Sequence, residues 1–253
     1  MEHRILDSVQ DALNNREFQL YLQPKVDMRT RQPVGAEALI RWIHPEMGFI
    51  SPGQFIPLLE REGLIYKVDQ YIWEEACKFL QARRAHGLSQ LPVSINLARA
   101  DFYQKDLLDV LDNLLKKYDL SPKLLHLEVI ERAYTDDTDK IFEVLTRLRE
   151  RGFAIEMDDF GVGASSLSMA AEMPVDVLKL DRSFVCTCVE NPKQTKVVQF
   201  IIELSKMLGA NLIAEGVETQ EQADLLCSMG CYYAQGYLYS KPKPAREFLQ
   251  TSA

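Results

Sequence analysis

Short apolar runs alternate with helix-period segments along the whole chain. Eight runs have the length and the β-branched or aromatic content of strands. The segments between them repeat apolar residues three and four positions apart, as at Leu107, Leu111 and Leu115, which predicts amphipathic helices. This alternation predicts a largely parallel sheet, and eight strands in 253 residues fit a closed (β/α)8 barrel of the TIM type. The expected strands are residues 18–26, 34–40, 92–97, 124–130, 153–157, 175–180, 211–214 and 232–237.

The pattern gives no sign of a second domain. We find no linker or low-complexity tract, so residues 1–253 are expected to form one α/β domain. Residues 1–16 have an amphipathic pattern and are expected to form a leading helix, which could be the end of a linker from an upstream domain. A further helix is expected to begin at Ser51-Pro52-Gly53, with Phe55 and Leu58 on its buried face.

Polar side chains stand where several of the predicted strands end. In a parallel barrel those ends meet at one mouth, where catalytic residues lie. A carboxylate there is costly to desolvate unless a cation lies against it. The polar residues at these positions are Glu37, Asn96, Glu128, Asp158, Asp159, Lys179, Glu215 and Gln235.

This set of side chains suits divalent cations. Carboxylate and amide oxygens without His or Cys ligands favour Mg²⁺ or Mn²⁺ over Zn²⁺. The adjacent acids Asp158 and Asp159 could bridge two ions, an arrangement that suits attack of an activated water on a phosphodiester. Lys179 would add a fixed cation that contacts phosphate or orients the water.

Each residue also has an interpretation without catalysis. Glu37 could be half of a simple ion pair, and Lys179 could be a solvated lysine. Asp158-Asp159-Phe160-Gly161 could be a turn, and Glu215 could open a helix. For these residues to share no function, all of these alternatives would have to be true at the same end of successive strands. The set as a whole therefore favours a functional site.

Charge and hydropathy exclude some functions. The formal net charge is −8, which argues against a long nucleic-acid groove but not against a small phosphate ligand bound with metal ions. No apolar run reaches the length of a membrane span, and the N-terminus has no signal-peptide pattern. We therefore expect a cytoplasmic domain without membrane contact of its own, possibly the cytosolic part of a membrane-anchored protein.

Eight short motifs follow one another along nearly the whole chain. They are Gln23-Pro24, Glu37-Ala38-Leu39-Ile40-Arg41-Trp42, Ser94-Ile95-Asn96, Leu127-Glu128-Val129-Ile130-Glu131, Asp158-Asp159-Phe160-Gly161, Lys179-Leu180-Asp181, Glu215-Gly216-Val217-Glu218 and Gln235-Gly236-Tyr237. A three-letter Glu-Ala-Leu match alone would be weak, but this many motifs in order are specific. In their order they resemble one known family, the EAL domain of cyclic di-GMP phosphodiesterases.

The resemblance implies a modified barrel whose first strand is antiparallel, and hydrolysis of cyclic di-GMP to linear pGpG in a two-metal site with Mg²⁺ or Mn²⁺. It implies that Lys179 orients the attacking water, that Glu215 and Glu37 share in catalysis, and that Glu131 anchors the loop after the Asp-Asp pair. The implied metal ligands are Glu37, Asn96, Glu128, Asp158, Asp159 and Glu215. The implied substrate-binding residues are Gln23, Leu39, Arg41, Asp181, Glu218, Gln235 and Pro242. A homodimer and an upstream GGDEF or sensor domain are possible partners in such a family.

Three positions depart from the family pattern. Ile130 stands where a threonine is usual, Val162 lacks the usual hydroxyl, and Ala164 lacks the usual aromatic ring. Two other hypotheses therefore stand beside the enzyme. One is a catalytically weak or silent receptor for cyclic di-GMP, and the other is a protein-interaction domain that binds no nucleotide.

Overall fold

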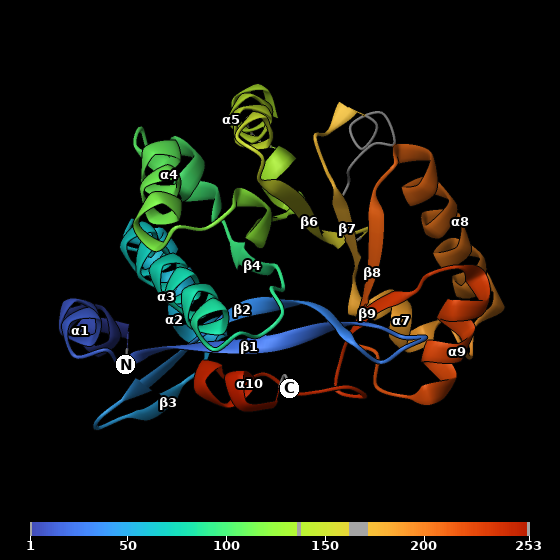
Figure 1. Cartoon of the computed structure of the whole chain (residues 1–253), viewed down its shortest axis with the longest axis horizontal. Coiled ribbons are helices and arrows are strands. Elements are labelled where there is room, and N and C mark those ends of the chain that lie inside the picture. Colours follow the sequence, from blue (N-terminus) through green and yellow to red (C-terminus); the bar gives the residue numbers. More distant parts are fainter. Residues whose placement is uncertain (1, 136–137, 162–171, 252–253) are drawn as a thin grey trace.

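The computed structural model describes residues 2–135, 138–161 and 172–251. Its centre is a ring of eight strands that closes because the first strand pairs with the second as well as with the last (Figure 1). All eight strands predicted from the sequence are present. The strands of the ring are β1 (Phe18–Asp27), β2 (Pro33–His44), β4 (Val93–Asn96), β5 (Leu125–Ile130), β6 (Ala154–Phe160), β7 (Val177–Leu180), β8 (Asn211–Glu215) and β9 (Tyr233–Gln235).

The first strand runs against its neighbours. β1 is antiparallel to β2 and to β9. Every other pair of neighbouring strands in the ring, from β2–β4 to β8–β9, is parallel. Two short antiparallel strands, β3 (Gly48–Ile50) and β10 (Lys243–Pro244), extend the sheet beyond the ring. The prediction of a modified (β/α)8 barrel with an antiparallel first strand is confirmed.

Helices surround the ring. In Figure 1, α3, α4 and α5 lie on one side of it, and α8 and α9 lie on the other. Their inward faces bury the apolar residues that the helical periodicity picks out, such as Leu107, Leu111 and Leu115 in α4. The helices are α1 (Glu2–Asn14), α2 (Pro52–Arg61), α3 (Ile65–Ala85), α4 (Leu107–Tyr118), α5 (Thr138–Glu150), α7 (Arg182–Thr187), α8 (Pro192–Leu208), α9 (Gln220–Met229) and α10 (Ala245–Thr251), with 3₁₀ turns at Arg99–Tyr103, Pro122–Leu124 and Glu131–Thr135.

A second apolar cluster supports the start of β1 and the end of β2, where Phe18 pairs with Trp42. Phe18, Trp42 and Phe55 pack ring against ring, with centroids 4.7–5.9 Å apart, beneath α1 and α2. α2 begins at Pro52, as predicted, and the Gln54 side chain accepts a hydrogen bond from the Ser51 amide at 3.2 Å. Burial of this cluster fixes the long β1–β2 hairpin that carries the first site residues.

β2 is longer than the sequence indicated. It runs to His44, because it continues into the hairpin with β1 and then pairs with β3. Glu37 therefore lies within a strand, and the prediction that it ends one is wrong. Asp158 and Asp159 also lie inside β6 instead of after it.

Among the residues described, no helix combines the length and the apolar character needed to cross a bilayer.

Candidate active site

The strand pleat points one set of polar residues into the barrel. Side chains alternate between the two faces of a strand, so residues at every second position line the interior. The inner residues near the carboxyl ends of the parallel strands include Glu37, Glu128, Asp158, Lys179 and Glu215. These five predicted residues come from five strands and meet at one point.

Lys179 occupies the centre of this group. Its Nζ lies 3.5 Å from Glu37 Oε2, 3.2 Å from Asp158 Oδ1 and 2.7 Å from Glu215 Oε1. It also donates a hydrogen bond to Glu128 Oε1. Its side chain is 1% exposed, which excludes the interpretation of Lys179 as a solvated lysine.

The negative charge exceeds what Lys179 can neutralise. Burial alone would lower the pKa of Lys179, but the surrounding carboxylates, led by Glu128, raise it well above its usual value. Burial and the charge of Glu37 raise the pKa of Glu128. Burial raises the pKa of Glu215 to about 7, against the opposing charge of Lys179. The free cluster therefore lacks positive charge.

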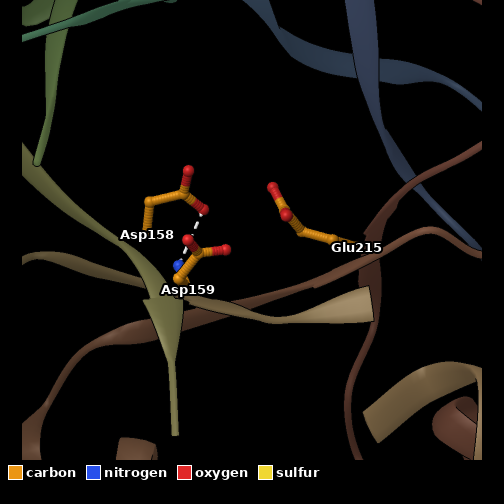
Figure 2. A group of neighbouring side chains, drawn as sticks. All are labelled: Asp158, Asp159 and Glu215. Atoms are coloured by element: carbon orange, nitrogen blue, oxygen red, sulfur yellow. Dashed lines mark hydrogen bonds between the residues drawn. The ribbon is translucent and has the colours of Figure 1, made fainter. Parts of the chain in front are cut away.

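The aspartate pair stands on an irregular part of β6. Asp159 has φ +56°, and the register with β7 shifts between Met157 and Phe160. This backbone turn lets both carboxylates face Glu215, as Figure 2 shows. One oxygen of each of the three acids lies within 4.8 Å of the others, and the Asp159 amide donates to Asp158 Oδ1 at 2.9 Å. Burial alone would raise the pKa of Asp158, but the charge of Lys179 opposes it, and the pKa is lowered. Burial and the charge of Asp158 raise the pKa of Asp159.

Asn96 ends β4 and pairs in register with Glu128. Its backbone carbonyl accepts a hydrogen bond from the Trp73 indole at 3.0 Å, which fixes the strand end against α3. Its side chain lines a cavity together with Glu37.

These residues fit a divalent metal site. The donors are oxygens, as Mg²⁺ and Mn²⁺ prefer, and they outnumber the local cation. Among the described residues, the buried Glu128 Oε2 has no hydrogen-bond partner, which is costly unless a cation approaches it. The carboxylate cluster can therefore hold a metal ion.

Gln235 holds Glu37 from the side, and Gln23 in turn contacts Gln235. Gln235 Nε2 donates to Glu37 Oε2 and, at 3.0 Å, to Gln23 Oε1, and Gln23 Nε2 donates to the Ser240 carbonyl at 3.1 Å. The backbone of Val217 passes so close to Gly236 that a Cβ there would lie 2.1 Å from the Val217 carbonyl oxygen. Only glycine allows this approach.

Two cavities open beside the acids and share Glu37 and Leu39. One, of about 250 Å³, is mostly apolar and is lined by Ile56, Trp73 and Arg41 among others. The other, of about 240 Å³, is polar and includes Gln23, Asp158, Lys179, Glu215, Glu218 and Gln235. The Arg41 guanidinium lies 5.7 Å from the centre of the Tyr21 ring. Ile130 is 42% exposed and lines the apolar cavity.

The remaining substrate-binding predictions are placed less centrally. Asp181 caps α7 by accepting a hydrogen bond from the Ser183 amide at 2.9 Å, and Glu218 pairs with Arg182 at 2.8 Å on the wall of the polar cavity. Pro242 lines neither of the two cavities. Roles for these three residues stay predictions.

Glu131 is 2% exposed and reaches β6. Its Oε2 accepts a hydrogen bond from the Gly161 amide at 2.9 Å, at the end of β6. This contact agrees with the predicted anchor of the following loop. The departures at Val162 and Ala164 lie outside the described residues.

Sequence reasoning missed two groups of buried acids and bases. Asp69 of α3 and Asp101 face each other beside the apolar cavity, where burial raises the pKa of Asp69 well above its usual value and that of Asp101 to about 7. Lys25 and Glu156 form a buried ion pair deeper in the barrel. The strand period of two signals the second group, because Lys25 follows Gln23 and Glu156 precedes Asp158 by two residues.

Comparisons with known proteins identify the family. A model of the EAL domain matches residues 6–242. The chain is 36% identical over 250 residues to the bifunctional diguanylate cyclase/cyclic di-GMP phosphodiesterase MucR of Pseudomonas aeruginosa, covering 99% of this chain and 36% of MucR. It is 37% identical over 251 residues to the cyclic di-GMP phosphodiesterase RocR of the same bacterium, covering 96% of this chain and 63% of RocR.

A solved structure of the MucR phosphodiesterase in complex with c-di-GMP has the same fold, with a TM-score of 0.92 and 36% identity, and the match covers 97% of this chain and 99% of that one. The chain thus spans about a third of MucR and under two thirds of RocR. Because the family match and these similarities run along nearly all of it, the chain belongs to the EAL domain family.

Proposed function

We propose that this chain hydrolyses cyclic di-GMP to linear pGpG in a site that holds Mg²⁺ or Mn²⁺. The observation that carries the proposal is the cluster of acids around buried Lys179, with more carboxylates than one lysine can neutralise. Relatives named cyclic di-GMP phosphodiesterases support the choice of substrate.

The metal ligands in this proposal are the six oxygen-bearing residues at the mouth. When bound there, divalent ions lower the pKa of water and neutralise charge on the phosphoryl oxygens. The residues themselves would orient the reaction. Lys179 would donate a hydrogen bond to the attacking water, and the Glu215 carboxylate, whose Oε1 lies 2.7 Å from Lys179 Nζ, would be placed to accept the proton of that water. The proposed ligands are Glu37, Asn96, Glu128, Asp158, Asp159 and Glu215.

The two cavities on either side of Glu37 would receive the rest of the substrate. The apolar one suits a purine base, with Trp73 and Ile56 against its face and the carboxyl of Asp69 within reach of the edge donors that guanine carries. Arg41 would face phosphate or base as a fixed cation. Gln235, itself contacted by Gln23, would hold Glu37 in place.

A product assay tests the proposal. The purified chain is incubated with cyclic di-GMP and Mg²⁺ or Mn²⁺, with EDTA as a control, and the products are separated by ion-exchange chromatography. We expect pGpG with metal and intact nucleotide with EDTA. Tight binding of cyclic di-GMP without turnover in either metal would refute the enzyme and favour a cyclic di-GMP receptor. If the chain bound no cyclic di-GMP, the hypothesis of a protein-interaction domain would remain.

A further inference from the structure

A second charged layer lies beneath the metal-binding cluster, towards the amino ends of the parallel strands. Lys25 of β1 is 3% exposed, donates a hydrogen bond to Ser94 Oγ at 2.6 Å and forms an ion pair with Glu156. Glu156 Oε1 is also 2.7 Å from His126 Nδ1.

Charge is balanced within this layer. Burial would raise the pKa of Glu156, but the charge of Lys25 and the hydrogen bond with His126 outweigh it and lower that pKa. The pair therefore requires no further ligand for its own stability. It nevertheless approaches the metal-binding cluster at one point.

That point is Glu128, which lies between two lysines. Its Oε1 accepts a hydrogen bond from Lys179, on the side of the mouth. Its Oε2 has no hydrogen-bond partner in the part of the chain that the structure describes, and it lies 3.8 Å from Lys25 Nζ. The side chain of Glu128 is 0% exposed, so bulk water screens this attraction much less than it would at the surface.

We propose that Lys25, itself held by Glu156 and Ser94, is a positioning residue that orients the Glu128 carboxylate for metal binding from the closed side of the barrel. The inference rests on the proposed metal site. Outer partners of ligating carboxylates fix their orientation, and their loss costs about 10–100-fold in metal affinity. Lys25 contacts neither the mouth cavities nor the other acids of the site.

The first test removes the pair without leaving a lone buried charge. Lys25→Met with Glu156→Gln should fold, because both charges go together. We expect Mn²⁺ affinity, measured by calorimetry without nucleotide, to fall about 10–100-fold. The matched control, Lys206→Met with Glu203→Gln, removes an exposed lysine–glutamate pair on α8 and should leave Mn²⁺ affinity unchanged. Wild-type Mn²⁺ affinity in the folded double variant would overturn the inference.

A rescue experiment separates positioning from packing. A cavity of about 190 Å³ at the amino ends of the strands is lined by Lys25, His126 and Tyr233, so small solutes have access to this layer. Lys25→Ala removes three carbons and a nitrogen, which propylammonium replaces. We expect propylammonium, and not 1-propanol, to restore Mn²⁺ affinity. Equal rescue by both, or rescue by neither, would contradict the role of the charge.

Because both readouts are metal binding, they are independent of turnover. A wild-type chain that binds Mn²⁺ but leaves cyclic di-GMP intact would refute the proposed function and leave this inference standing. A wild-type chain that binds no Mn²⁺ would refute both.

Discussion

The two ends of the barrel interior both bury charged side chains, but they balance them differently. Near the amino ends of the strands, Lys25 meets Glu156, and the two charges cancel. Near the carboxyl ends, one lysine, Lys179, faces an excess of acids, four of which lie within 4 Å of its Nζ. The first arrangement is complete without a ligand, whereas the second is costly until cations arrive.

This difference separates a structural ion pair from a cluster of residues that can carry out chemistry. Buried ion pairs are common structural features, so burial of a charge alone does not mark an active site. What marks the mouth is the surplus of oxygen donors together with the orphaned oxygen of Glu128 and two adjoining cavities.

The largest effect should follow Glu128→Gln. The amide keeps the shape but removes the charge of a ligand that lies between the two layers. Loss of several kcal/mol of charge stabilisation corresponds to about 10³-fold in kcat/KM. Initial rates with cyclic di-GMP and Mn²⁺ measure this. A folded variant that keeps the wild-type rate would remove Glu128 from the metal-ligand set.

Lys179→Met should lower kcat by about 10²–10³-fold, more than it lowers substrate affinity. It also removes the cation that contacts the acids in the free protein, so the metal-free variant should be less stable. Added Mn²⁺ should then raise its melting temperature more than that of the wild type. Thermal unfolding with and without Mn²⁺ tests this. An equal shift in both proteins would mean that lysine and metal do not share the same carboxylates.

Glu131 gives a smaller and more local effect. Glu131→Ala removes the acceptor for the Gly161 amide, whereas Glu131→Gln retains one. We expect about a 10-fold loss of activity for alanine and a much smaller loss for glutamine. Assays of the two variants side by side decide the point. Equal losses would show that the charge of Glu131 matters and that the hydrogen bond does not.

The last prediction concerns stability and not activity, at an acid near the mouth outside the metal cluster. Burial raises the pKa of Asp101 to about 7 from an ordinary value near 3.8, so its folded state prefers the protonated form. The stability that this gives is present below pH 4 and is lost as the pH rises to about 7. Asp101→Asn should therefore gain stability relative to wild type between pH 5 and about 7, and level off above. A difference in unfolding free energy that stays constant across this range would contradict it.

The fold and the mouth were predictable because they depend on local pattern and motif order. All eight strands follow from apolar runs, and the antiparallel β1 follows from the family resemblance. The length of β2 was missed, since its pairing with β3 depends on a hairpin that carries polar residues such as His44 and Arg41.

Other features could not be predicted from the sequence, because they depend on how distant segments pack in the fold. Asp69 and Asp101 meet only because α3 packs beside the turn after β4, which no short-range pattern reports. Lys25 and Glu156 are 131 residues apart in sequence. Their shared layer follows from the strand alternation once the register is known, because each stands two residues from a residue at the mouth.

The most direct test of the account is to count the metal ions that the chain binds. Metal-free protein is titrated with Mn²⁺, and free Mn²⁺ is followed by electron paramagnetic resonance in wild type and Glu128→Gln. The account predicts two ions per wild-type chain, with binding strongly weakened by the substitution. Absence of specific Mn²⁺ binding, or binding that is the same in both proteins, would contradict it.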